Sequence, residues 1–217
     1  MGKQVSYALT LEDGSKHRFD VDVDRPATHK RGALPVWTAL DENRCPNCPL
    51  PSTEGAACPA AADLVPVVER FSRLSSITRA DVRITTDERE VRKETDAQTA
   101  LSALMGLIMA TSGCPILRRL KPLAVMHLPF ATPTETIYRT VAAHLVHAML
   151  EGKPADIEEL RRFYDDVDTL NHAFIDRLRA AAQKDASLNA LVVLQAGGSL
   201  VSFSLEDGLK RLRSLYA

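Results

Sequence analysis

The spacing of apolar residues changes near residue 96, and this change is the feature that most limits the fold. Before it, apolar and polar residues alternate in two stretches, 5–23 and 80–95, each divided by a short polar turn. Alternation is typical of strands with one buried face, and a short turn between two such runs predicts an antiparallel hairpin. After residue 96 the apolar residues recur at helical spacing. We therefore expect an α+β fold, with an N-terminal antiparallel sheet (two hairpins plus one helix) followed by a C-terminal helical bundle.

Prolines and caps indicate where the first helices begin. Between the hairpins we expect a helix over residues 59–74, because Pro59 suits the first helical position, where its missing N–H costs nothing. Pro66 lies inside this stretch and predicts a kink or a later start. Asp96 can cap the next helix, which we expect to end at Gly113 as its terminator. That helix is apolar on almost every side, so we expect it at the centre of the protein.

The rest of the second half is expected to be helical as well. Residues 132–135, with the sequence Thr-Pro-Thr-Glu, form a capping box that has proline at the first helical position. Further helices are expected over residues 155–183, 186–196 and 205–216.

The chain of 217 residues is 45% hydrophobic, which suits one large domain or two small ones that share a core. We expect residues 1–95 to form the sheet, one helix and a Cys-Pro-rich loop at 25–59. Residues 96–217 are expected to pack against this sheet as a helical region, and the two parts to unfold as one cooperative unit. Long loops in compact proteins are usually functional or disordered, and the cysteines of this loop favour function.

The charge balance argues against a nucleic-acid partner. The 27 basic and 28 acidic residues leave a net charge of −1, without the basic surplus typical of nucleic-acid binders. The first residues alternate like strands and do not resemble a secretory signal. The apolar helical stretch at 100–110 is about half as long as a membrane span, which needs roughly 20 residues. We therefore expect a cytoplasmic protein without membrane contact, whose cysteines are reduced.

Each of the four cysteines, Cys45, Cys48, Cys58 and Cys114, is followed by proline. Proline removes one N–H beside each sulfur and biases the cysteine toward an extended backbone. The spacing of Cys45 and Cys48 lets two sulfurs bind one centre. Cys58 falls at the expected N-cap of the helix over 59–74, where the dipole and free N–H groups would lower its pKa. We expect all four cysteines to meet where the halves join and to bind a metal.

Three interpretations of the cysteines remain open. The preferred one is an iron–sulfur cluster, because four thiolates suit one cluster and proline commonly follows a ligating cysteine in bacterial cluster sequences. The second is a structural zinc site with four cysteine ligands, although zinc ribbons usually pair two Cys-x-x-Cys turns and this chain has one. The third is a set of buried or redox-labile thiols without a cofactor, with Cys45 and Cys48 as a possible dithiol pair.

Other residue types give weaker signals. His127 follows Cys114 along the chain and is interpreted as an ordinary hydrogen-bonded histidine, with a fifth ligand or a partner to a sulfur as alternatives. Asn171 and Asn189 lie within apolar helical patterns and suit buried hydrogen-bonding anchors. The sequence contains no P-loop, no G-x-G-x-x-G and no G-x-S-x-G motif, so no catalytic residue is assigned.

Five short segments resemble those of a known family. They are 45–50 (CPNCPL), 58–61 (CPAA), 106–115 (GLIMATSGCP), 127–132 (HLPFAT) and 185–190 (DASLNA). Together they resemble a bacterial family of about this length that is described only as a domain of unknown function. The resemblance covers most of the chain. It implies that these segments belong to the pattern of such proteins, and it transfers no catalytic residue.

The leading functional expectation is a cytoplasmic protein that binds a cysteine-ligated iron–sulfur cluster and serves redox sensing or electron transfer. The alternative is a non-catalytic structural or interaction protein. In that case the cysteines hold zinc, or no metal, and the helical half binds a partner protein. The sequence leaves open whether the protein is an enzyme.

Overall fold

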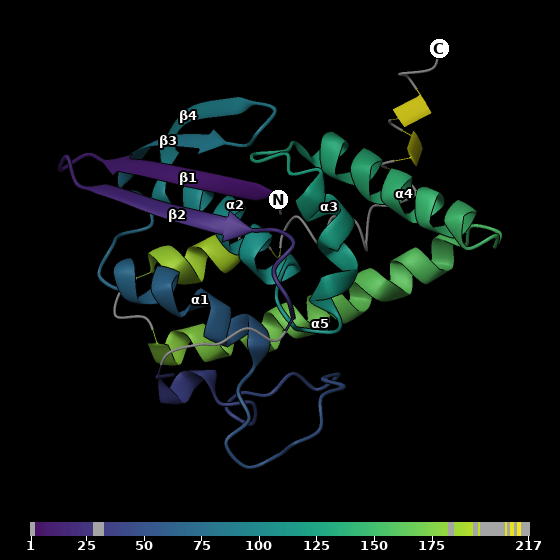
Figure 1. Ribbon diagram of the computed structural model, residues 1–217, viewed down its shortest axis with the longest axis horizontal. Helices are drawn as coiled ribbons and strands as arrows, with labels where there is room; N and C mark the ends of the chain where they lie inside the picture. The colour runs from purple at the N-terminus through teal and green to yellow at the C-terminus, as the bar shows by residue number, and fades with distance from the viewer. Residues whose placement is uncertain are drawn as a thin grey trace.

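The computed structural model describes residues 3–27, 33–181, 185–192, 195, 207, 209–210 and 212–213. It contains one four-stranded antiparallel sheet, followed by helices (Figure 1). The strands are β1 (Gln4–Leu11), β2 (Lys16–Asp22), β3 (Arg79–Thr85) and β4 (Glu90–Asp96), in the order β2-β1-β3-β4. The predicted α+β class, with both hairpins in one sheet, is confirmed.

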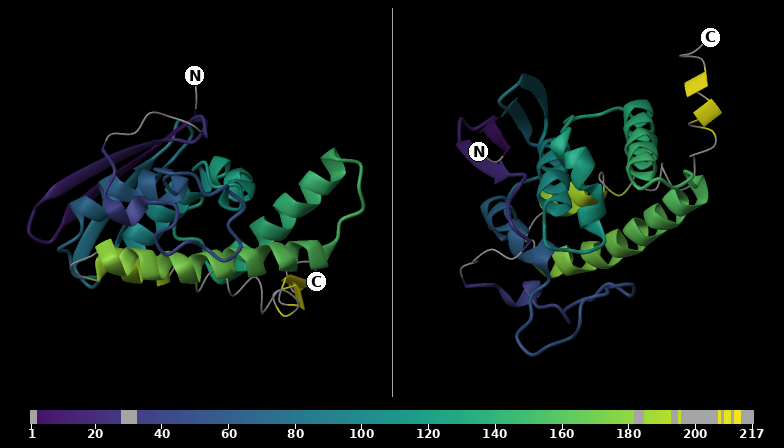
Figure 2. Two further views of the ribbon diagram at one scale, coloured as in Figure 1. Left: turned by 90° about the horizontal axis from the view of Figure 1, so that it is seen from below. Right: turned by 45° about the vertical axis from the view of Figure 1, so that its right-hand side comes forward.

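The alternation of side chains on the central strand β1 explains why the sheet forms. Val5, Tyr7 and Leu9 are at most 1% exposed, whereas the residues between them are partly or fully exposed. Tyr7 pairs with Phe19 of β2 and with Ile84 of β3, so apolar side chains of three strands line the same face. The helices α1 (Pro59–Arg70) and α2 (Ala97–Ala110) lie on this side of the sheet (Figures 1 and 2).

The predicted starts of α1 and α2 are confirmed, and the end of α2 has a different cause from the one predicted. Helix α1 has Pro59 in its first turn and includes Pro66, so the alternative of a later start is wrong. Asp96 caps α2 by accepting a hydrogen bond from the Thr99 N–H at 2.8 Å. Helix α2 is central as expected. It ends at Ala110, and Gly113 lacks the positive φ of a glycine terminator.

The loop before α1 contains one 3-10 turn, η1 (Val36–Thr38). The second half consists of helices of very different length, and it begins after α2 with the 3-10 turn η2 (Leu117–Leu120). The short α3 (Lys121–Val125) precedes α4 (Pro133–Leu150), which starts with the predicted capping box, and α5 (Ile157–Ala181). Residues 186–192 are helical as expected. Much of the helix expected over 205–216 lies outside the described residues.

Helix α5 connects the distant parts of the fold. It pairs with α4 at one end and extends to α1 and η1 at the other (Figures 1 and 2). Its buried side chains join the main core, which also takes residues from the sheet, α1 and α2. A smaller core lies between α4 and α5 around Phe163 and Tyr164. Residues of both halves therefore share a hydrophobic core, and unfolding as one cooperative unit stays a prediction.

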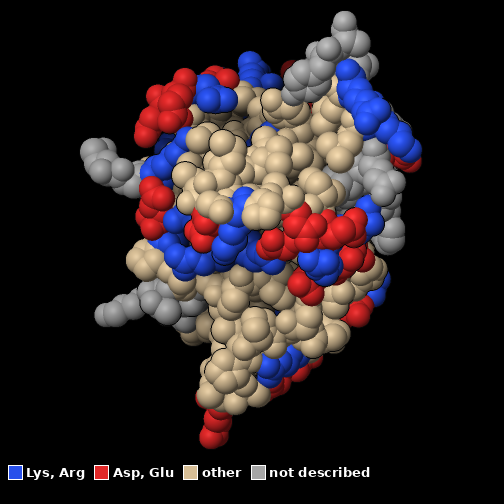
Figure 3. All heavy atoms as spheres, turned by 90° about the vertical axis from the view of Figure 1, so that its right-hand side faces the viewer, with Lys and Arg blue, Asp and Glu red and all other residues tan. Residues whose placement is uncertain are grey.

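Helix α4 leaves apolar side chains exposed at the end of the molecule. Tyr138, Leu145, Val146, Met149 and Leu150 are each at least 40% exposed. Figure 3 looks onto this end and shows uncharged surface bordered by a band of charged side chains. Among the described residues no helix has both the length and the apolar character of a membrane span.

Candidate cysteine centre

The four cysteines come from three places in the fold. Cys45 and Cys48 lie in the loop before α1, Cys58 is the N-cap residue of α1, and Cys114 follows α2. All four are free thiols; Cys48 is partly exposed, and the other three are buried. Cys48, Cys58 and Cys114 all act electrostatically on Cys45, and Cys48 and Cys58 act on Cys114. The structure therefore brings the four thiols into one region.

Cys58 and Cys114 each lie at the start of a helical turn, and the proline that follows each of them decides which N–H groups approach the sulfur. Cys58 has the extended conformation that was expected, with φ −64° and ψ 117°, and Pro59 follows it. The Ala60 and Ala61 N–H groups favour the Cys58 thiolate, although the Cys58 side chain forms no capping hydrogen bond. The Ile116 and Leu117 N–H groups act in the same way on Cys114. Because proline has no N–H, the next two N–H groups are the ones available to the sulfur.

Burial nevertheless outweighs these N–H groups. It raises the pKa of Cys45 to about 12, with the neighbouring thiols as a further cause. It also raises the pKa of Cys58 and of Cys114. The expectation that the helix N-terminus would give Cys58 a lowered pKa is therefore wrong. Because the thiolate is the reactive form, a raised pKa makes Cys45 a poor nucleophile, which weakens the dithiol interpretation.

The loop that carries Cys45 and Cys48 is attached to α5. The Cys45 thiol donates to the Leu170 carbonyl at 3.9 Å. The Asn47 side chain donates to the backbone carbonyl and the carboxylate of Asp166, at 2.9 and 3.2 Å. The Cys48 N–H donates to the Cys45 carbonyl at 3.0 Å, which closes the turn between the two cysteines. Helix α5 therefore fixes the position of two of the four thiols.

A buried arginine of α5 lies beside the thiols. Arg177 is 1% exposed, and it acts on both Cys45 and Cys58 in the direction that favours their thiolates. Its guanidinium donates to backbone carbonyls of the same loop, at distances from 2.6 to 3.3 Å. The acceptors are Trp37, Ala39, Leu40 and Asn43.

Arg177 has no carboxylate partner among the described residues, and its buried Nε–H has no hydrogen-bond partner there. A buried guanidinium keeps its charge, and an unpaired buried charge is costly. The thiols Cys45 and Cys58 are the groups beside it that can become negative. The charge of Arg177 therefore fits a centre whose thiolates are bound to metal and carry net negative charge.

Arg177 is not among the residues predicted for the site, although the sequence carries a signal for it. Buried side chains of α5 recur at helical spacing, and Phe163, Leu170 and Phe174 are among them. Arg177 continues this stripe at the next helical step, where an apolar residue would be expected. A charged residue on the buried face of an amphipathic helix indicates a buried partner of opposite charge.

The ends of α1 and α2 are held together next to Cys58 and Cys114. Arg25 pairs with the fully buried Asp63 carboxylate of α1 at 3.1 Å. It also donates to the Ile108 and Thr111 carbonyls at the end of α2, at 2.9 and 3.2 Å. Arg25 thus bridges an acidic side chain on α1 and the last carbonyls of α2, which attract a cation.

The described side chains do not form a preorganised site for a metal ion. Among the described residues, no three His, Cys, Asp or Glu side chains surround one point closely enough to hold a single metal ion. A tetrahedral zinc site needs sulfurs only about 3.8 Å apart, given its Zn–S bonds of about 2.3 Å. Zinc would therefore require the thiols to move closer together. The donor set and charge of the site otherwise fit a metal centre.

His127 is not placed as a ligand of this centre. Its Nε2 lies 2.5 Å from the hydroxyl of Tyr7, a fully buried residue of β1. Burial is the main cause that lowers the pKa of His127 to about 4, with smaller contributions from Arg139 and Lys3. The interpretation as an ordinary hydrogen-bonded histidine is confirmed for this pair.

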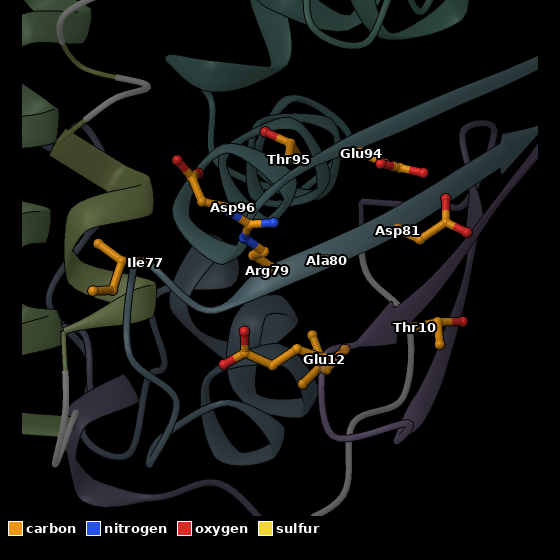
Figure 4. A pocket seen from close by; sticks show the side chains of 10 residues that line it. Thr10, Glu12, Ile77, Arg79, Ala80, Asp81, Glu94, Thr95 and Asp96 are labelled. Atoms are coloured by element: carbon orange, nitrogen blue, oxygen red, sulfur yellow. The ribbon is translucent and has the colours of Figure 1, made fainter.

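A hollow of about 520 Å³ at the end of the sheet contains several acidic residues (Figure 4). Its carboxylates spread across the hollow and do not point at one another. Asp81 pairs with Arg92 at 2.7 Å, and Asp96 caps α2. These two carboxylates are thus already used, and the acidic cluster is not a candidate site.

The fold and the site define an α+β protein with four Cys-Pro cysteines gathered where its sheet and helices meet. The chain belongs to a family described as a domain of unknown function (DUF6901), which matches residues 5–217. No curated protein and no solved structure matches it. The predicted resemblance to such a family is confirmed, and its bacterial origin stays a prediction.

Proposed function

We propose that Cys45, Cys48, Cys58 and Cys114 bind an iron–sulfur cluster, and that the protein serves redox sensing or electron transfer in the cytoplasm. The observation that supports this proposal is the buried Arg177, which lacks a carboxylate partner among the described residues and acts on Cys45 and Cys58. Four thiolates on a cluster would supply the negative charge that balances the guanidinium.

A cluster tolerates a wider spacing of its sulfur ligands than a single zinc ion does. In a cluster each thiolate can bind a different iron, so the sulfurs stay farther apart than around one ion. The raised pKa of Cys45 is compatible with this proposal, because a bound metal displaces the thiol proton. Metal binding would accordingly become tighter as the pH rises.

Metal analysis of protein purified without oxygen tests the proposal. We expect iron and acid-labile sulfide in similar amounts, with the broad visible absorption of sulfur-to-iron charge transfer. One zinc per chain would overturn it in favour of the structural or interaction role. The absence of both metals after anaerobic reconstitution with iron and sulfide would overturn it in favour of free thiols.

Variants of Arg177 test whether its charge belongs to the centre. We expect Arg177→Met to lose most of its iron, and Arg177→Lys to keep more because it retains the positive charge. Arg92→Met is the matched control, since Arg92 is exposed and pairs with Asp81 on the sheet, and it should keep its iron. Circular dichroism of the metal-free variants separates lost binding from lost folding.

Electrochemistry provides a second measurement. A positive charge beside a cluster stabilises its reduced form, so any cluster left in Arg177→Met should have a more negative reduction potential. A full complement of iron with an unchanged potential in Arg177→Met would contradict the assigned role of Arg177. Full iron content in every single Cys→Ser variant would overturn the proposed ligands.

A further inference from the structure

A second cavity, with a volume of about 440 Å³, lies beside α2. Its walls come from α2, α4, α5 and the segment after α3, and most of its surface is apolar. Small residues on one side of α2 leave the space open. Among these, Ala103 and Gly106 keep some exposure in the middle of an otherwise buried helix because they face the cavity.

The charged side chains that line this cavity have one sign. Its described lining residues include Lys93 and Arg139 but neither Asp nor Glu. The whole chain has 28 acidic and 27 basic residues, so an equal mixture would be expected. Lys93 is exposed, and its ammonium lies 4.9 Å from the centre of the Phe130 ring, which also lines the cavity. A cavity lined in this way favours an anion.

Arg139 is the charged group that lies deeper in the protein. Its Nη2 donates to the Leu123 and Met126 carbonyls, at 3.0 and 2.6 Å. Glu135 acts on it electrostatically, but Arg139 forms no ion pair within 4 Å among the described residues, and its Nε and Nη1 have no hydrogen-bond partner there. The two carbonyls occupy Nη2, so Nε and Nη1 remain available for single charge-assisted hydrogen bonds to a carboxylate.

Two neutral polar side chains of the lining are also left without partners in the described part of the chain. Asn171 of α5 is 3% exposed and Ser102 of α2 is 7% exposed, and both line the cavity. Neither side chain forms a hydrogen bond to the described residues. Their polar atoms are not among the described side-chain atoms that are buried without a partner, so they are open to the cavity and can bind a ligand or water there.

The contact between Tyr7 and His127 adds a further donor. The Tyr7 hydroxyl is fully buried, and His127 Nε2 is its hydrogen-bond partner. The hydroxyl proton is satisfied only if Tyr7 donates it to Nε2, because the described residues offer it no other acceptor. In a neutral ring the remaining proton then lies on Nδ1, which makes this nitrogen a donor. His127 lines the cavity as well.

We propose that this cavity binds a small organic carboxylate with an apolar body. Arg139 binds the carboxylate group, and Asn171, Ser102 and His127 donate further hydrogen bonds. The apolar wall takes the rest of the molecule. At ordinary packing density the volume fits a ligand of about a dozen non-hydrogen atoms. The site is separate from the cysteines, so this proposal does not depend on the iron–sulfur cluster.

Calorimetric titration with decanoate tests the proposal, because its carboxylate and ten-carbon chain match these features. We expect one decanoate to bind per chain. Decan-1-ol, the neutral analogue, should bind at least tenfold more weakly, and decyltrimethylammonium should not bind. Absence of decanoate binding, or equal binding of all three probes, would overturn the proposal.

Three variants locate the binding. Arg139→Met should remove the preference for decanoate over decanol, whereas structural damage alone would weaken both probes together. Arg139→Lys should keep part of this preference. Ala103→Leu fills the cavity and should abolish binding of both probes. Arg162→Met is the matched control, since Arg162 is exposed on α5, and it should bind decanoate as the native protein does.

Two outcomes of these titrations would contradict the site. Unchanged preference in Arg139→Met would show that its guanidinium does not bind the carboxylate. Undiminished binding in a folded Ala103→Leu variant would place decanoate elsewhere, for example on the exposed apolar side chains of α4. Thermal unfolding of each variant without probe shows whether it is folded.

Discussion

Gly113 and Pro59 are in contact, and this contact joins the segments that carry Cys114 and Cys58. A Cβ atom at Gly113 would lie 3.3 Å from the Pro59 Cβ and 2.5 Å from the Ala27 carbonyl oxygen. The second distance is too short for any real Cβ, and the atom that blocks it belongs to the backbone. Glycine is therefore required here for close approach and not for helix termination.

We expect Gly113→Ala to destabilise the protein by about 2 kcal/mol, because the backbone at Ala27 must move. The shift should also separate Cys114 from Cys58 and lower the metal content. Urea unfolding and metal analysis measure the two effects. Gly14→Ala is a useful control: Gly14 has φ +81° and no atoms near its Cβ position, so this variant should lose stability but keep its metal. Native metal content in a destabilised Gly113→Ala variant would contradict the coupling.

The Asp63 carboxylate should contribute strongly to stability through Arg25. It is fully buried and pairs with Arg25 at 3.1 Å. We expect Asp63→Asn to cost about 3 kcal/mol in unfolding free energy, because the Arg25 charge loses its partner. The double variant Arg25→Met with Asp63→Asn should cost less than the sum of Arg25→Met and Asp63→Asn alone. Additive losses in this double-mutant cycle would show that the pair does not act as a unit.

His127 should make the protein less stable in acid. Its pKa of about 4 lies below the ordinary value of 6.5, so the unfolded state binds the proton more readily. The contribution of His127 to the free energy of unfolding is complete above pH 6.5 and is lost as the pH falls toward 4. It is at most about 3 kcal/mol. Urea unfolding at pH 7 and pH 4.5 should show a larger loss in the native protein than in His127→Asn. Equal losses in both proteins would disprove this account.

Cys45 should make the metal-free protein less stable in alkali. Its pKa of about 12 lies above the ordinary value of 9.0, so the folded state holds the proton more tightly. The contribution is complete below about pH 9 and is lost as the pH rises toward 12, by up to about 1.4 kcal/mol per pH unit. Unfolding measured in reductant at pH 8 and pH 10 should show this loss, and Cys45→Ala should show less of it. Parallel pH profiles of the two proteins would contradict the raised pKa.

Local patterns predicted much of the fold because they act over a few residues. Alternation in β1 and the caps at Asp96 and Thr132 depend on neighbours in the chain, and the structure agrees with each of them. The pKa of Cys58 was wrongly predicted for the complementary reason. The helix N-terminus is visible in the sequence, whereas the burial that outweighs it comes from other parts of the chain.

The sequence by itself determined the strands, most helix starts and the backbone restriction at the four Cys-Pro pairs, since each follows from backbone preferences and short-range hydrogen bonds. Only the tertiary structure decided which distant groups meet. It placed Arg177 beside Cys45 and Cys58, and it placed Arg139 and Asn171 around one cavity. These meetings depend on how α5 and α4 pack against the rest of the protein, and the local pattern of a helix can mark a buried residue such as Arg177 without showing which distant groups it meets.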